Sequence, residues 1–168
     1  MVNRGRGGSN LDKARSEIEA GDLVPKRKRN KKRITATPVR ELARHAVEAI
    51  LSKKGREIVV LDVHAVSGVA DIFLISTGDS DLQIRAIHDA VQAELRERAG
   101  EKPWHVEGTD HAQWVLMDYV DLVVHIFSPE KREFYSLERL WGDAPREQVP
   151  DDGVADEVAL LSQTNGSS

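Results

Sequence analysis

The chain has no cysteine, few aromatic residues (three Trp, two Tyr and three Phe) and no long apolar run. Without cysteine, disulfides and thiolate metal sites are excluded, which fits a reducing compartment. No segment approaches the ~20 apolar residues that span a bilayer. No signal-peptide pattern stands at the start of the chain. These absences lead us to expect a cytoplasmic protein that makes no use of a membrane.

The net charge of −4 is unevenly distributed along the 168 residues. Residues 1–33 hold 11 Lys and Arg against 4 Asp and Glu, which makes this end strongly basic. Residues 34–142 hold 12 Lys and Arg against 18 Asp and Glu, and residues 143–168 hold 1 basic residue against 6 acidic ones. The chain therefore has a basic N-terminal end, an acidic middle and an acidic C-terminal end.

The two ends also contain few large apolar residues, so neither can bury enough surface to offset the entropy lost on ordering. We predict a disordered basic arm over residues 1–36 and a disordered acidic tail over residues 147–168. A single folded domain is predicted over residues 37–146, a length typical of one domain.

Hydrophobic periodicity and turn residues predict eight elements in this domain. Helices are expected over 38–54, 80–100 and 129–141, and strands over 57–63, 71–76, 104–107, 113–117 and 122–127. Ser80 and Gln83 form a capping-box pattern at the start of the second helix. The fold class is α/β, a single domain with a mixed five-stranded sheet flanked by helices in the order α-β-β-α-β-β-β-α.

The segment 76–81 lies between a strand and a helix, where phosphate-binding loops occur. Asp79 and Asp81 would repel a phosphate there, and no lysine follows as in a P-loop, which favours a capped helix start. Nucleotidyl transfer would need paired carboxylates to hold two Mg²⁺ ions, whereas the neighbouring strand offers only Asp62 and His64. We expect no catalytic residue and no cofactor.

The six histidines show neither an HExxH motif nor a pair at helical i,i+4 spacing. His105, His111 and His125 could converge on adjacent strands with a nearby carboxylate. Scattered strand histidines are more often core or surface residues than zinc ligands, because zinc needs three or four ligands in a fixed geometry. We therefore expect no metal site.

A dense basic run lies in the N-terminal arm. It consists of Lys26, Arg27, Lys28, Arg29, Lys31, Lys32 and Arg33. The run contains no aromatic residue that would stack on bases. It is either a solvated tail or a non-specific attachment to RNA phosphates that acts through counterion release.

Four segments, at residues 71–78, 108–118, 121–125 and 134–141, together resemble the ribosomal silencing factor family, also called Iojap-like. The resemblance covers roughly residues 38–146. It implies a nucleotidyltransferase-like architecture without catalysis. It further implies binding to the large ribosomal subunit through its protein fourteen, a block to joining of the small subunit, and a homodimer when the protein is free.

The docking residues follow from this resemblance rather than from the pattern alone. Strand alternation puts Trp114 on the same face as Leu116, which by itself favours the core. The resemblance implies instead that Trp114 and Tyr119 dock on the ribosome, with Asp118, Lys131 and Arg132 at the rim. Two alternatives remain open, a nucleotidyltransferase-like enzyme and an RNA-binding adaptor in ribosome assembly. The family usually has glycine where this chain has Val120, so the hairpin turn is expected to differ.

Overall fold

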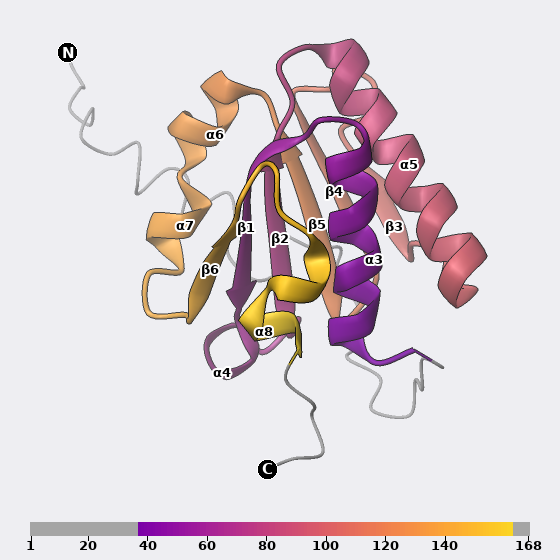
Figure 1. Ribbon diagram of the computed structural model, residues 1–168. Helices are drawn as coiled ribbons and strands as arrows, with labels where there is room; N and C mark the ends of the chain where they lie inside the picture. Colours follow the sequence, from indigo (N-terminus) through magenta and orange to yellow (C-terminus); the bar gives the residue numbers. More distant parts are fainter. Residues whose placement is uncertain (1–36, 163–168) are drawn as a thin grey trace, which may run out of the picture.

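A computed structural model describes residues 37–162. The predicted arm at 1–36, with its basic run, and the last six residues lie outside the described range. The fold is a six-stranded sheet in the order β3-β4-β5-β2-β1-β6, with helices on both faces (Figure 1). Only β2 and β5 pair in parallel, and all other neighbours are antiparallel. The sheet is therefore mixed, as predicted.

The strands are β1 (Arg56–Asp62), β2 (Ile72–Thr77), β3 (His105–Glu107), β4 (Trp114–Asp118), β5 (Leu122–Phe127) and β6 (Arg146–Val149). The helices are α3 (Val39–Ser52), α4 (His64–Ser67), α5 (Asp81–Ala99), α6 (Pro129–Tyr135), α7 (Leu137–Leu140) and α8 (Ala159–Ser162), with a 3₁₀ turn, η2 (Ala155–Glu157). None of the described helices is both long and apolar enough to cross a bilayer.

The predicted elements are present, and local capping sets the two ends of α5. The Ser80 hydroxyl accepts a hydrogen bond from the Gln83 amide at 3.0 Å, and α5 ends at Gly100 with a φ of 67°. The single helix predicted over 129–141 is wrong, because Ser136 adopts a φ of 49° and divides it into α6 and α7. A left-handed residue interrupts the helical hydrogen bonds at that point.

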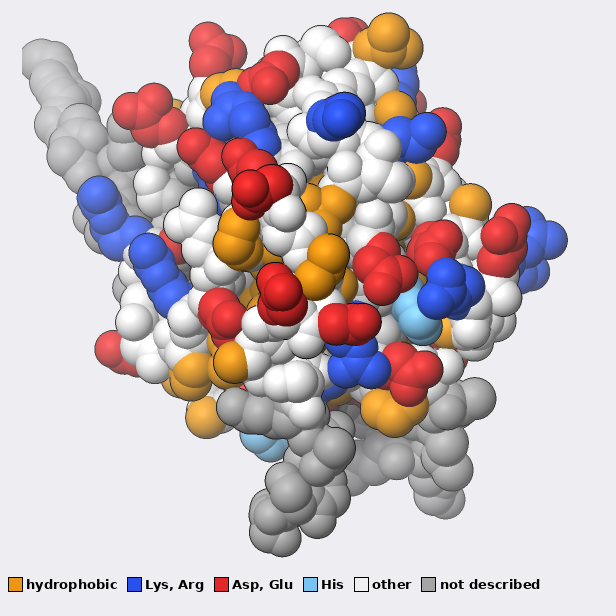
Figure 2. All heavy atoms as spheres, in the orientation of Figure 1, with side chains coloured by type: hydrophobic (Ala, Val, Ile, Leu, Met, Phe, Trp, Pro, Cys, Tyr) orange, Lys and Arg blue, Asp and Glu red, His pale blue; other side chains and the backbone are white. Residues whose placement is uncertain are grey.

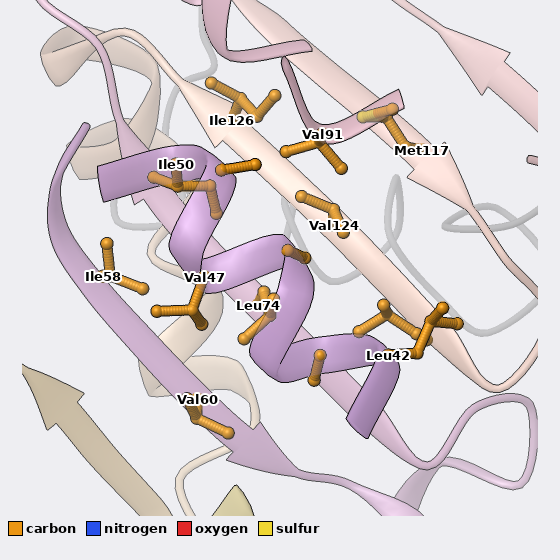
Figure 3. Packing of buried hydrophobic residues seen from close by; sticks show 14 of the residues in the cluster. Leu42, Val47, Ile50, Ile58, Val60, Leu74, Val91, Met117, Val124 and Ile126 are labelled. Carbon is orange, nitrogen blue, oxygen red and sulfur yellow. The ribbon is translucent and has the colours of Figure 1, made fainter. Parts of the chain in front are cut away.

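The core has two parts because the sheet is covered on both faces. The larger part lies between the sheet and helices α3 and α5, where alternate residues of the strands meet the apolar stripes of the helices. Figure 3 shows this packing, with Leu42, Val47 and Ile50 of α3 among the strand side chains. All six residues of β5 are buried. This confirms the prediction, drawn from its lack of alternation, that this strand is covered on both faces.

The smaller part of the core lies on the other face, beneath α6 and α7. It joins Phe73, Leu116 and Phe127 of the strands to Leu137 of α7. Two short helices cover this face, so several aromatic side chains at its edge are only partly buried. The predicted docking residue Trp114 is one of these partly buried aromatic residues.

The prediction of a disordered tail from residue 147 is wrong for residues 147–162, and the prediction of five strands is wrong by one. β6 pairs with β1 in an antiparallel register, and α8 packs on α3. Arg40 and Arg44 of α3 donate hydrogen bonds to the carbonyls of Leu160 and Leu161 at 2.5 and 2.6 Å. This segment has few apolar residues. They are buried because α3 and β1 provide a surface against which they pack.

The β4–β5 turn keeps a backbone conformation that favours glycine. Val120 has a φ of 79°, and the Asp121 amide donates to the Tyr119 carbonyl at 3.0 Å, an i to i+2 bond that makes a γ-turn. The Asp118 carboxylate accepts the Val120 amide at 2.8 Å. Val120 thus has a positive φ although it is β-branched, and these bonds hold the strained residue in place.

Candidate docking surface

Trp114 lies at the start of β4 and faces α6. Its indole ring stacks on Phe127 with ring centroids 4.9 Å apart and contacts Tyr135 at 4.5 Å. Its Nε1–H donates a hydrogen bond to Nδ1 of His125 at 3.1 Å. Trp114 is only partly buried. A tryptophan held by a ring stack and a hydrogen bond presents its exposed edge in a fixed orientation.

His125 is the buried support of Trp114. The side chain has no exposed area, and burial lowers its pKa to about 3. The imidazole is therefore neutral near pH 7, and its Nδ1 keeps the lone pair that accepts the indole N–H. The proton sits on Nε2, which is buried and has no hydrogen-bond partner among the described residues. Sequence reasoning considered His125 only as a metal ligand and missed this supporting role.

Helix α6 continues the aromatic surface beside Trp114. Tyr135 contacts Phe134 edge to face at 4.8 Å, and the Lys131 ammonium lies 5.9 Å from the centre of the Phe134 ring. All three side chains are partly exposed. We call Trp114, Lys131, Phe134 and Tyr135 the Trp114 patch. The aromatic pair that follows the helix-starting proline was the signal that could have found Phe134 and Tyr135.

Arg132 was predicted at the rim of the docking surface, but its guanidinium is engaged within the fold. It forms a salt bridge with Glu138 at 2.5 Å and donates to the Thr77 hydroxyl at 2.9 Å. The side chain is 11% exposed. These bonds fix α6 to α7 and to the end of β2. The role that follows from them is to position the helix that carries Lys131.

Tyr119 and Asp118 are not surface residues, which corrects their assignment to a docking surface. Tyr119 is 1% exposed and belongs to the core under α3 and α5, on the opposite face of the sheet from Trp114. Burial raises its pKa above the ordinary value for tyrosine. Asp118 is 0% exposed and caps the hairpin turn. Alternation along β4 already separates positions 114 and 119, since an odd spacing changes the face.

The carboxylates considered for phosphoryl transfer are far apart and already paired. Asp62 forms a salt bridge with Arg40 at 3.0 Å at the end of β1. Asp79 is bound by Arg56 at the start of β1, and this hydrogen bond holds the pKa of its carboxyl below the ordinary value. Six residues of strand separate the two pairs by about 20 Å. They therefore cannot hold two metal ions together.

The position of Trp114 depends on a glycine. Gly108 has a φ of 89°, and a Cβ added there would lie 2.0 Å from the Trp114 carbonyl oxygen. We expect Gly108→Ala to lower the free energy of unfolding by at least ~2 kcal/mol, because backbone strain and a backbone clash add. Gly68→Ala is the control, since Gly68 also has a positive φ but nothing within 4 Å of an added Cβ. Urea unfolding that gave equal losses for both variants would contradict the clash.

Comparison with known proteins places the chain in a family. Residues 36–166 match the family described as "Ribosomal silencing factor during starvation". The chain is similar to "Ribosomal silencing factor RsfS" of Bacillus subtilis, with 45% identity over 103 residues that cover 60% of this chain and 84% of that protein. A mouse relative named "Mitochondrial assembly of ribosomal large subunit protein 1" is 28% identical over 130 residues, which cover 69% of this chain and 57% of the mouse protein.

A solved structure has the same fold. The crystal structure of protein CV0518 from Chromobacterium violaceum aligns with a TM-score of 0.61 and 36% identity, covering 63% of this chain and 88% of that one. The family is named for silencing and not for a reaction, in agreement with the prediction that the protein is not an enzyme. Since the family match spans most of the chain, the protein belongs to the family of the ribosomal silencing factor during starvation.

Proposed function

We propose that the protein represses translation by binding the large ribosomal subunit through the Trp114 patch and excluding the small subunit. The observation that carries this proposal is the partly exposed Trp114, oriented by His125 and continued by the aromatic residues of α6. Tryptophan and tyrosine dominate the binding energy of protein interfaces. A preoriented ring loses little conformational freedom on binding, so more of its contact energy appears as affinity.

The names of the relatives support the ribosome as the partner. Bacterial relatives are named as ribosomal silencing factors, and the mouse relative is named for assembly of the large subunit. We assign protein fourteen of the large subunit as the docking partner on the family resemblance. The mechanism requires no active site, because a small rigid domain on a subunit-joining surface excludes a larger partner by overlap. Its strength then follows mass action against subunit joining.

We expect Trp114→Ala to weaken binding to purified large subunits by at least about tenfold, which corresponds to the ~2 kcal/mol lost at an interface hot spot. Co-sedimentation through a sucrose cushion measures the bound fraction. Trp104→Ala is a matched control, since Trp104 is 45% exposed but lies beside Asp118, at the other end of β4. Lys131→Glu should also reduce binding, and it leaves the aromatic contacts of the patch in place.

Thermal unfolding of each variant separates lost contact from lost folding. If the Trp114→Ala protein unfolds below the assay temperature, its loss of binding carries no information on docking. The binding of the Lys131→Glu protein then tests the assignment of the surface. Full binding by a folded Trp114→Ala protein, or equal loss with Trp104→Ala, would contradict the assignment of the surface. Binding to large subunits without inhibition of subunit joining would favour the assembly role that the name of the mouse relative describes.

A further inference from the structure

Helices α3 and α5 bring three metal-ligating side chains together on the face of the domain opposite the Trp114 patch. His45 and Glu48 stand at i and i+3 on α3, so they share one side of that helix. Glu94 reaches the same point from α5. One ligand atom from each of the three residues lies within 4.8 Å of the other two. This is the one such group among residues 37–162.

The imidazole of His45 is oriented as a ligand would be. Its Nδ1 is buried and has no hydrogen-bond partner within the described part of the chain, and it lies 4.0 Å from a Glu48 carboxylate oxygen. Its Nε2 is directed to Glu41, at 3.8 Å from a carboxylate oxygen. This distance is too long for a hydrogen bond, so Glu41 would have to move closer to give the carboxylate support that a metal-bound histidine usually has.

We propose that His45, Glu48 and Glu94 form a binding site for a divalent transition metal, with zinc as the best match. One imidazole nitrogen and two carboxylate oxygens suit zinc, whereas Mg²⁺ and Ca²⁺ prefer oxygen ligands alone. Tetrahedral coordination needs ligand atoms roughly 3.5 Å apart, so the side chains must close by about 1 Å. The two glutamates are partly exposed, and water would supply the fourth ligand.

The surroundings fit a site at the surface of the helix pair. Figure 2 shows several acidic side chains, with basic ones among them, on the face formed by α3 and α5. Nδ1 of His45 is buried, so an ion would reach it only as the partly exposed carboxylates of Glu48 and Glu94 move to admit it. Arg98 forms a salt bridge with Glu94 at 3.1 Å and would have to release one carboxylate oxygen. A bound ion would join α3 to α5 and stabilise the folded chain in proportion to its occupancy.

The test is isothermal titration of the tag-free full chain with Zn²⁺ near pH 7. We expect one ion per chain, and at least a tenfold weaker affinity in each of His45→Gln, Glu48→Gln and Glu94→Gln. Glu97→Gln is the control on α5, since Glu97 is exposed and outside the group. His105→Gln tests the alternative that zinc binds the exposed His105 and Glu107 pair.

A second readout is the unfolding temperature with and without Zn²⁺. It should rise with zinc in the wild type and in Glu97→Gln, and stay constant in the three ligand variants. Glu48→Gln and Glu94→Gln alter exposed ends of helical side chains, so they keep the test valid should His45→Gln fail to fold. Three results would each overturn the proposal. They are no binding at millimolar zinc, undiminished zinc binding in the ligand variants, and displacement of zinc by an equal concentration of Mg²⁺.

Discussion

We expect a chain that ends at Arg146 to have a lower free energy of unfolding than the full chain. The decrease should exceed the cost of a single core substitution. The shortened chain lacks Val149, Val158 and Leu161, which are all buried against the core. Leu161→Ala alone should cost about 2–5 kcal/mol, because its side chain is 0% exposed and leaves a cavity beside α3. The truncation also removes the strand that pairs with β1 and exposes the edge of the sheet.

Urea unfolding followed by circular dichroism measures both changes. A chain that ends at Ser162 keeps every described residue and serves as the control for the truncation. Val154→Ala is the control for the point substitution, since Val154 is 52% exposed. If the chain ending at Arg146 unfolded at the same urea concentration as the full chain, β6 and α8 would contribute nothing to the stability of the domain.

Acidification is expected to destabilise the protein through His125. The imidazole takes up a proton below pH 6.5 in the unfolded chain, but only below about pH 3 in the folded protein. Between these values the unfolded state binds more protons, so the free energy of unfolding falls by about 1.4 kcal/mol for each pH unit. The loss reaches roughly 3 kcal/mol at pH 4, and above pH 6.5 the residue adds no pH dependence.

His125→Gln isolates this contribution, because the amide stays neutral and its oxygen is able to accept the Trp114 indole N–H. Carboxylates also titrate in this range, so the quantity to compare is the slope of stability against pH in the variant and in the wild type. We expect a shallower slope in the variant between pH 6 and 4. Identical slopes would mean that His125 takes up its proton in the folded state as readily as in the unfolded state.

The strands and the two long helices could be predicted from local pattern because their determinants are close in sequence. β5 begins with three consecutive apolar residues, Leu122 to Val124, and α5 begins at a Ser80 cap and ends at Gly100. The break at Ser136 had no such local signal, because serine rarely adopts a positive φ without tertiary contacts. Errors in the predicted elements thus fall where distant contacts override local preference.

The candidate docking residues divide in the same way. Trp114 was found through the family resemblance, and alternation alone assigned its face correctly. The same resemblance grouped Tyr119 with it, although five positions along a strand lead to the opposite face. Arg132 appears exposed in a helical pattern, and only its contacts with Glu138 and Thr77 reveal a positioning role.

The sequence by itself determined the α/β class, the order of the five predicted strands and the two long helices, and the family, because these depend on periodicity, capping residues and motif spacing along the chain. The tertiary structure alone decided the sixth strand, since β6 and α8 are stable only against β1 and α3. It also decided the burial of Tyr119 and the meeting of Glu94 with His45. Residues 49 positions apart have no local signal for contact, because packing of whole helices, and not the pattern within either one, brings them together.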